Sequence, residues 1–179
     1  MYGISKSRSP IFLKEKPKVL AVDIDLCSGC QSCVMACSLI KEGVFSPTKS
    51  RIQVYANESK CFSVPNMCDH CIDPPCIPAC PVDAITRDEI SGIVRIDEKI
   101  CTGCGDCPDA CPFDSIRIRD EIAVKCDLCG GDPECAKVCY PYAIQYIEKQ
   151  PATIRNKNRL AERRKQAIAA VKRGDFPEP

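Results

Sequence analysis

The chain has 179 residues, a length that fits one or two small domains, and it contains no tryptophan and only ten phenylalanines and tyrosines together. No apolar stretch approaches the roughly 20 residues that a membrane-spanning helix needs, so the sequence predicts no direct membrane insertion. The formal charge is +1. Nucleic-acid binding would rest on charge alone, because the sequence contains no recognisable nucleic-acid-binding module.

Residues 1–18 are expected to form an N-terminal arm. Residues 1–20 contain neither the apolar core of a signal peptide nor a twin-arginine pair. This predicts a cytoplasmic protein, or one that reaches a membrane only peripherally through a complex.

Sixteen of the 17 cysteines fall into four quartets. In chain order they are Cys27, Cys30, Cys33 and Cys37; Cys68, Cys71, Cys76 and Cys80; Cys101, Cys104, Cys107 and Cys111; and Cys126, Cys129, Cys135 and Cys139. The first and third read C-x2-C-x2-C-x3-C, and the third continues into Pro112, as in bacterial ferredoxins. A [4Fe–4S] cluster needs one thiolate at each of four irons, so the sequence predicts four [4Fe–4S] clusters with these sixteen cysteines as iron ligands.

Two other uses of cysteine compete with this prediction. Zinc ribbons also contain C-x2-C pairs, but a tetrahedral zinc site has no use for three cysteines in C-x2-C-x2-C. A disulfide framework needs an oxidising compartment, which the N-terminal sequence does not indicate. Both stay open as weaker alternatives.

The quartets repeat in pairs. Ile24-Asp25 precedes the first quartet as Ile96-Asp97 precedes the third, and the second and fourth begin with the matching phrases C-D-H-C and C-D-L-C. The self-similarity indicates duplication of a two-cluster module. Between the quartets, β-branched runs predict short hairpins at residues 19–24, 51–55, 92–97, 115–119 and 122–124, with single helical turns at each fourth cysteine. The expected fold is α+β: tandem ferredoxin-like two-cluster modules over residues 19–147, loop-rich, with a strand-containing insertion around 39–67.

Residues 148–179 are expected to form a basic C-terminal helical extension. From residue 151 onward there are eight Lys/Arg against three Asp/Glu, and residues 158–173 carry helix signals that stop at Gly174. One interpretation is a solvated helix. The other is that Leu160, Ile168 and Val171 pack on a larger subunit, so that deleting residues 156–179 would weaken partner binding and leave every cluster in place.

Two single residues stand out. Cys61 belongs to no quartet and is expected to be an inert core or surface thiol, with a redox or ligand role as the alternative. His70, the only histidine, lies between Cys68 and Cys71. It is expected to pack or hydrogen-bond beside a cluster, and a hydrogen bond that tunes the cluster potential is the sharper hypothesis.

The order of the quartets, with the phrases M-C-D-H-C-I-D-P-P-C-I-P-A-C-P, C-T-G-C-G-D-C-P-D-A-C-P-F and K-C-D-L-C, resembles the iron–sulfur subunits of molybdenum and tungsten pterin oxidoreductases, of the dimethyl-sulfoxide-reductase type. The compact C-D-L-C-G-G-D-P-x-C phrase is similar to the small subunits of tungsten aldehyde oxidoreductases and of tungsten benzoyl-CoA reductase.

The resemblance implies that each fourth cysteine is exchanged between clusters. Cys139 would join Cys27, Cys30 and Cys33; Cys37 would join Cys126, Cys129 and Cys135; Cys111 would join Cys68, Cys71 and Cys76; and Cys80 would join Cys101, Cys104 and Cys107. It also implies an electron-transfer subunit, not an enzyme by itself, that serves a larger pterin-tungsten or pterin-molybdenum catalytic subunit. A further electron-transfer subunit or a soluble ferredoxin would be the other partner. The alternative function is a free-standing polyferredoxin electron carrier.

Overall fold

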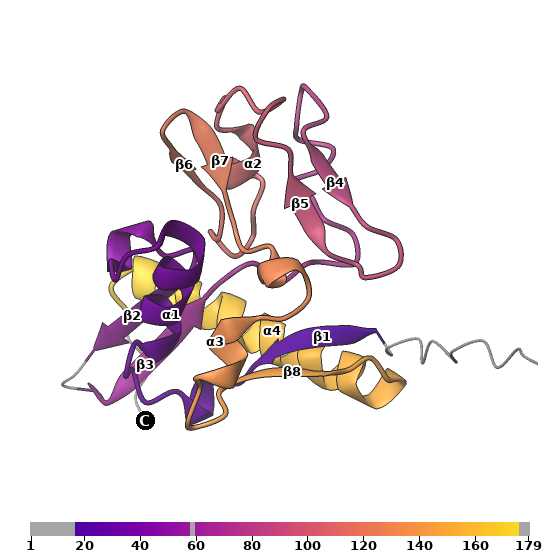
Figure 1. The fold of residues 1–179 in the computed structure, drawn as a ribbon. Coiled ribbons are helices and arrows are strands. Elements are labelled where there is room, and N and C mark those ends of the chain that lie inside the picture. Colours follow the sequence, from indigo (N-terminus) through magenta and orange to yellow (C-terminus); the bar gives the residue numbers. More distant parts are fainter. Residues whose placement is uncertain (1–16, 58–59, 176–179) are drawn as a thin grey trace, which may run out of the picture.

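The computed structural model describes residues 17–57 and 60–175 (Figure 1). In this part of the chain all strands pair in antiparallel couples. β1 (Lys18–Val22) pairs with β8 (Ile144–Glu148), β2 (Gln53–Asn57) with β3 (Phe62–Asn66), β4 (Ile85–Arg87) with β5 (Val94–Ile96), and β6 (Arg117–Arg119) with β7 (Ile122–Val124).

The helices are α1 (Ser32–Glu42), α2 (Asp106–Asp109), α3 (Glu134–Lys137) and α4 (Pro151–Lys172). Short 3₁₀ turns lie at Ile24–Leu26, Pro47–Lys49 and Leu128–Gly130. Small sheets mixed with helices confirm the predicted α+β class. The prediction of single helical turns at the fourth cysteines is wrong for α1, which extends over 11 residues because Gly43 ends it only at the left-handed C-cap.

Two lobes divide the described chain (Figure 1). The lower lobe contains β1, β2, β3, β8, α1, α3 and α4, and the upper lobe contains β4 to β7 with α2. Buried aliphatic side chains and buried cysteines share the same cores. Leu20, Ile52 and Met67 belong to the lower core, and Val94 and Ile116 to the upper one. Each core is thus built around thiols as much as around hydrocarbon.

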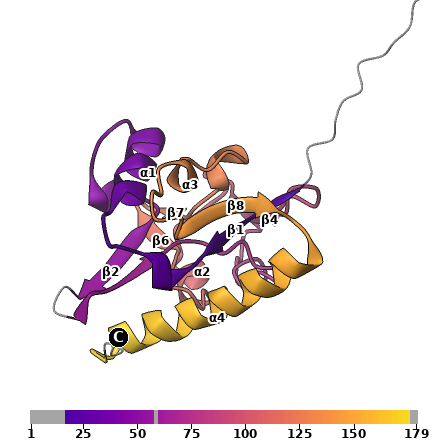
Figure 2. The same cartoon turned by 90° about the horizontal axis from the view of Figure 1, so that it is seen from below.

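β1, at the start of the described chain, pairs with β8, which directly precedes α4. The helix α4 crosses beneath this pair of strands (Figure 2). Leu20, Ala21 and Val22 are all buried, since α4 covers one face of β1 and the lower core covers the other. The pairing links segments more than 120 residues apart, as the register of Val22 with Ile144 shows, and the local strand pattern does not predict it.

The helix of the C-terminal extension begins at Pro151, seven residues before the predicted start. Gln150 and Thr153 form a capping box, in which the Gln150 backbone N–H donates to Thr153 Oγ1 at 2.7 Å. Proline is well suited to the first helical position because it has no N–H to leave unpaired. The capping box and the proline mark the start of α4, and the prediction from the apolar residues of 158–173 did not take them into account.

The apolar face of α4 packs on the chain itself. Leu160 and Ile168 are 5% and 3% exposed, and Ile168 packs with Val64 of β3. The hypothesis that these two side chains pack on a catalytic subunit is therefore wrong. An amphipathic pattern indicates that one helix face is covered, but it does not identify the surface that covers it. The charged face of α4 is largely exposed, as the solvated-helix interpretation predicted, with Lys157 and Arg164 as buried exceptions.

Candidate cluster sites

Site A lies in the lower lobe, where the loop before α1 meets the segment before β8. Cys27, Cys30, Cys33 and Cys139 line one hollow there. Burial, and then the charges of neighbouring thiolates including Cys139, raise the pKa of the Cys33 thiol to about 12. Cys139, the fourth cysteine of the last quartet, thus lies with the first three cysteines of the first quartet.

Site B lies one helical turn further along α1 and contains Cys37, Cys126, Cys129 and Cys135. Cys37 follows Cys33 by about one helical turn, and α1 packs against α3, which carries Cys135. Burial, and then the charges of Cys126 and Cys37, raise the pKa of Cys135. One helix therefore borders both sites of the lower lobe.

Sites C and D contain the second and third quartets, again with exchanged fourth members. Site C is a hollow lined by Cys68, Cys71, Cys76 and Cys111. Site D is a hollow lined by Cys80, Cys101, Cys104 and Cys107. The structure thus brings all sixteen quartet cysteines into four groups, in the grouping that the resemblance implied.

The four sites follow one another in the order A, B, C, D. Thiols of adjacent sites share the same buried clusters. Cys33 of site A, Cys126 and Cys135 of site B and Cys68 of site C belong to the lower core. Cys76 of site C and Cys107 of site D belong to the upper core. Cys30 of site A and Cys104 of site D are exposed, whereas every cysteine of sites B and C is buried or half-buried. The series is therefore most open to solvent at its two ends.

The thiol chemistry of the four sites fits iron–sulfur clusters. Burial is the first cause that raises the pKa of Cys126 to about 12 and that of Cys71 and Cys107 to about 11. Such thiols stay protonated near neutral pH unless a metal supplies positive charge. Among the described residues no three His, Cys, Asp or Glu side chains are grouped to hold a single metal ion. The ligands of a cubane bind four separate irons and lie correspondingly further apart.

Backbone N–H groups already donate to several of these sulfurs. Sγ of Cys80, Cys101 and Cys139 each accepts a hydrogen bond at 3.3 Å, from the amides of Ala84, Ala123 and Ile144. The Leu128 amide donates to Cys126 Sγ at 3.4 Å. Amides aimed at sulfur stabilise the thiolate and influence the potential of a bound cluster.

Gly103, in the loop of site D, is required by close packing. Its φ is +67°, and a Cβ there would lie 2.3 Å from the Glu121 carbonyl oxygen. The turn between β6 and β7 is therefore in direct contact with the ligand loop of site D, and only glycine at position 103 allows the two backbones to lie this close together.

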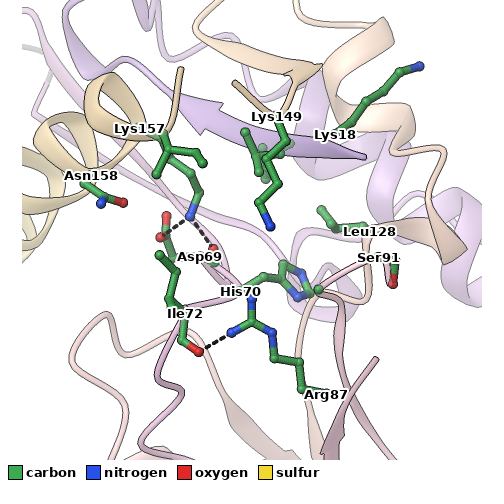
Figure 3. Close-up of a pocket in the computed structure, with 14 residues that line it drawn as sticks. Lys18, Asp69, His70, Ile72, Arg87, Ser91, Leu128, Lys149, Lys157 and Asn158 are labelled. Atoms are coloured by element: carbon green, nitrogen blue, oxygen red, sulfur yellow. Dashed lines mark hydrogen bonds and ion pairs between the residues drawn. The ribbon is translucent and has the colours of Figure 1, made fainter. Parts of the chain in front are cut away.

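Site C is held by cations. Asp69, between Cys68 and Cys71, binds Lys157 and Arg164 of α4, each at 2.7 Å. Arg87 of β4 donates to the carbonyls of Cys71 and Ile72. Figure 3 shows Lys157 and Arg87 around the 69–72 loop, with Lys149 extending toward His70 in the same cavity.

Arg164 also reaches the other segment of site C. Its guanidinium lies over the Phe113 ring at 5.0 Å, two residues after Cys111. α4 thereby holds the loop with Cys68 and Cys71 and the segment with Cys111 together. Sequence reasoning did not identify Asp69, Lys157 or Arg164 as part of a site.

The repeated C-D-x-C phrase gave one sequence signal that an aspartate anchors the ligand loop. Asp127 occupies the position in C-D-L-C that Asp69 occupies in C-D-H-C. Asp127 also binds two cations, Lys41 of α1 at 2.7 Å and Arg51 at 3.3 Å. Each C-D-x-C loop is therefore anchored through its aspartate, although the cations come from unrelated segments.

Two buried basic side chains, His70 and Lys125, form no ion pair among the described residues. The Val94 amide donates to His70 Nδ1 at 3.0 Å, so the neutral ring carries its proton on Nε2. Burial lowers the pKa of His70 to about 2, and in the described residues Nε2 has no hydrogen-bond partner. Lys125 is 4% exposed and forms no ion pair in the described part of the chain. The Nε2–H group of His70 and the ammonium of Lys125 would both interact favourably with an anionic cluster. Their lack of acidic partners therefore fits sites that hold such clusters.

The odd cysteine, Cys61, lies outside the four sites. It is exposed, at the turn before β3, with a φ of +47°. Its exposed position agrees with the surface thiol predicted from sequence.

Comparisons with known proteins identify a family and several relatives. Residues 59–149 match the model of a family described as a 4Fe-4S dicluster domain. The polyferredoxin-like subunit of an aliphatic sulfonate oxidoreductase from Pyrococcus furiosus is 42% identical over 119 residues, 65% of this chain and 68% of the relative. A tetrathionate reductase subunit from Salmonella typhimurium is 37% identical over 134 residues, 67% of this chain and 53% of the relative.

Among solved structures, the active-site complex BamBC of benzoyl-coenzyme A reductase is similar at a TM-score of 0.43 and 24% identity, over 82% of this chain and 89% of that one. The chain spans about half the length of the tetrathionate reductase subunits that it matches and about two thirds of the Pyrococcus relative.

The fold and the cysteine sites define an iron–sulfur protein. The chain belongs to the 4Fe-4S dicluster domain family. The relatives from Pyrococcus furiosus and Salmonella typhimurium are subunits of oxidoreductases. No helix of the described residues has the length and apolar character to cross a bilayer.

Proposed function

We propose that the chain carries electrons through four [4Fe–4S] clusters, to or from a pterin-bound tungsten or molybdenum catalytic subunit. The observation that carries the proposal is the order of the four sites. Buried thiols of adjacent sites share the lower core from site A to site C and the upper core from site C to site D, and the quartet cysteines exposed to solvent lie at the two ends. Such a series has one end for a donor and one for an acceptor.

The proposed iron ligands are the sixteen cysteines, grouped as in sites A to D. When bound, each cluster supplies one-electron chemistry at a potential set by charge, hydrogen bonds and solvent exposure. The residues of the chain hold the thiolates in place, donate amide hydrogen bonds to sulfur and exclude water from the two inner sites. None of these roles requires catalysis by the chain itself.

The proposed catalytic partner is supported by the resemblance of the cysteine phrases to subunits of tungsten and molybdenum enzymes. The finer prediction of a cytoplasmic aldehyde oxidoreductase or benzoyl-CoA reductase type of complex stays a prediction. Anaerobic affinity purification from the native organism, with tungsten and molybdenum analysis of the captured protein, tests it. A captured partner without either metal would contradict this part of the proposal.

A free-standing polyferredoxin is the second candidate. It is favoured by the packing of α4, because the apolar face of this helix is already covered by the chain and needs no partner. Elution of the native holoprotein without any larger subunit at low ionic strength would favour this candidate.

The number of clusters can be measured directly. The holoprotein is expected to contain about 16 irons and about 16 acid-labile sulfides per chain, because four sites each provide four thiols. Anaerobic iron, sulfide and zinc analysis of fully reconstituted protein is the measurement. About four zinc ions per chain with no iron would rule out the electron-transfer function.

A further inference from the structure

Lys125 is a buried cation whose position is fixed by the backbone. It directly follows β7 and precedes Cys126, and its side chain is 4% exposed. Its ammonium donates to two carbonyl oxygens, those of Val94 and of Cys126, the latter at 2.8 Å. Both acceptors are neutral. In the described part of the chain no carboxylate pairs with this charge.

A buried ammonium without an anion is costly, because carbonyl groups replace only part of its hydration. Proteins keep such a charge where an anionic group offsets the cost. Asp127, two residues along the chain, already binds two other cations. Lys125 directly precedes Cys126 of site B, and its ammonium donates to the carbonyl of Val94, a residue that also lines the hollow of site C. The ammonium therefore lies between the two sites.

A single residue of β5 places Lys125 between the two sites. The Val94 carbonyl accepts from Lys125, and the Val94 amide donates to His70, which lies between two cysteines of site C. β5 thus connects the ligand loop of site C to Lys125, the residue that precedes Cys126 of site B. Val94 is 1% exposed, so its two hydrogen bonds are buried, and Lys125 also lines a polar hollow together with Glu98 and Asp127.

We propose that Lys125 is the counter-charge shared by the clusters of sites B and C, and that it raises the midpoint potential of both. This inference rests on the proposed function. A cubane gains one negative charge on reduction, and a fixed cation in a low-dielectric interior stabilises the reduced form more than the oxidised form. The two outer sites have an exposed cysteine each and are screened by water from the same charge. The inner pair is therefore easier to reduce than it would be without Lys125.

The test compares holoprotein variants by potentiometric titration followed by electron paramagnetic resonance. Lys125→Met and Lys125→Gln remove the charge, and glutamine keeps a donor for the carbonyls. Lys125→Arg keeps the charge. Lys165→Met, at an exposed position of α4, is the control for a change in net charge. Iron and sulfide are measured first in every sample. A wild-type chain that holds no clusters would contradict the proposed function and not this inference alone.

In loaded protein, the neutral variants are expected to shift two of the four midpoint potentials to more negative values. Arginine is expected to restore them, and Lys165→Met to shift none. Wild-type potentials in either neutral variant, or an equal shift of all four, would overturn the proposal. If both neutral variants lost the inner clusters, full loading of the arginine variant would support a requirement for charge. Loss of the inner clusters in the methionine, glutamine and arginine variants alike would overturn the proposal, because the shape of the lysine side chain, and not its charge, would then be required.

Discussion

Replacing Arg164 by methionine is expected to remove the cluster of site C and to destabilise the whole chain. Arg164 is 1% exposed and connects α4 to Asp69 and to the face of Phe113. Removing one partner of a buried ion pair costs about 3–5 kcal/mol, and Lys157 remains on Asp69, so we expect about 3 kcal/mol. Iron should fall from about 16 to about 12 per chain. Iron analysis and the temperature at which cluster absorbance is lost are the measurements.

Arg163 provides the matched control, since it is the adjacent residue on the same helix. Its ion pair with Asp25 is exposed, so Arg163→Met is expected to leave iron content and thermal stability near those of the wild type. Equal behaviour of the two variants would show that α4 does not support site C. The same reasoning reverses the expectation for deletion of residues 156–179: the truncated chain should lose the site C cluster, since the deletion removes Lys157 and Arg164 together.

Replacing Cys37 by serine is expected to damage the cluster of site B and to spare that of site A. Cys37 lies with Cys126 and Cys135, although in sequence it follows the cysteines of site A. One of the four resonance signals should therefore disappear or change, with loss of one to about four irons per chain. Iron analysis and resonance spectra of the reduced protein follow both effects.

Comparison with other variants identifies the damaged site. The spectrum of Cys37→Ser should lack the component that is missing in Cys126→Ser and retain the one that is missing in Cys27→Ser. The opposite assignment would mean that Cys37 serves site A, and the exchange of fourth cysteines would be refuted. Cys61→Ser is the control for removal of a thiol outside the sites and should retain all four signals.

Local patterns in the sequence predicted the loops that carry the cysteines. They did not predict the side chains from distant segments that surround those loops. Ligand spacing within a loop such as Cys101–Cys107 is a property of a few residues, so it is readable without the fold. The strands at 122–124 and near 94–96 were predicted for the same reason. The grouping of Cys37 with Cys126 came from the resemblance, not from spacing, because a fourth cysteine one turn along a helix can face either of two sites.

The contacts that hold the sites join distant segments, and no local signal identifies such partners. Asp69 and Arg164 are 95 residues apart, and Lys18 of β1 is in register with Glu148 of β8. The apolar face of α4 was recognised, but its partner was assigned to another protein because a period of 3.6 residues says nothing about what lies opposite. The buried position of Lys125 had no sequence signal apart from its place beside Cys126.

The exchange of fourth cysteines also orders the events of synthesis. Sites C and D need only residues 68–111, whereas site A is incomplete until residue 139 and site B until residue 135. A chain leaving the ribosome therefore completes the thiols of sites C and D before those of either site of the lower lobe. Cysteines 27–37 precede the thiols that complete their sites by about 100 residues. Site C also needs Lys157 and Arg164 of α4, which follow every quartet in the sequence, so insertion of iron into nascent chains should begin with site D.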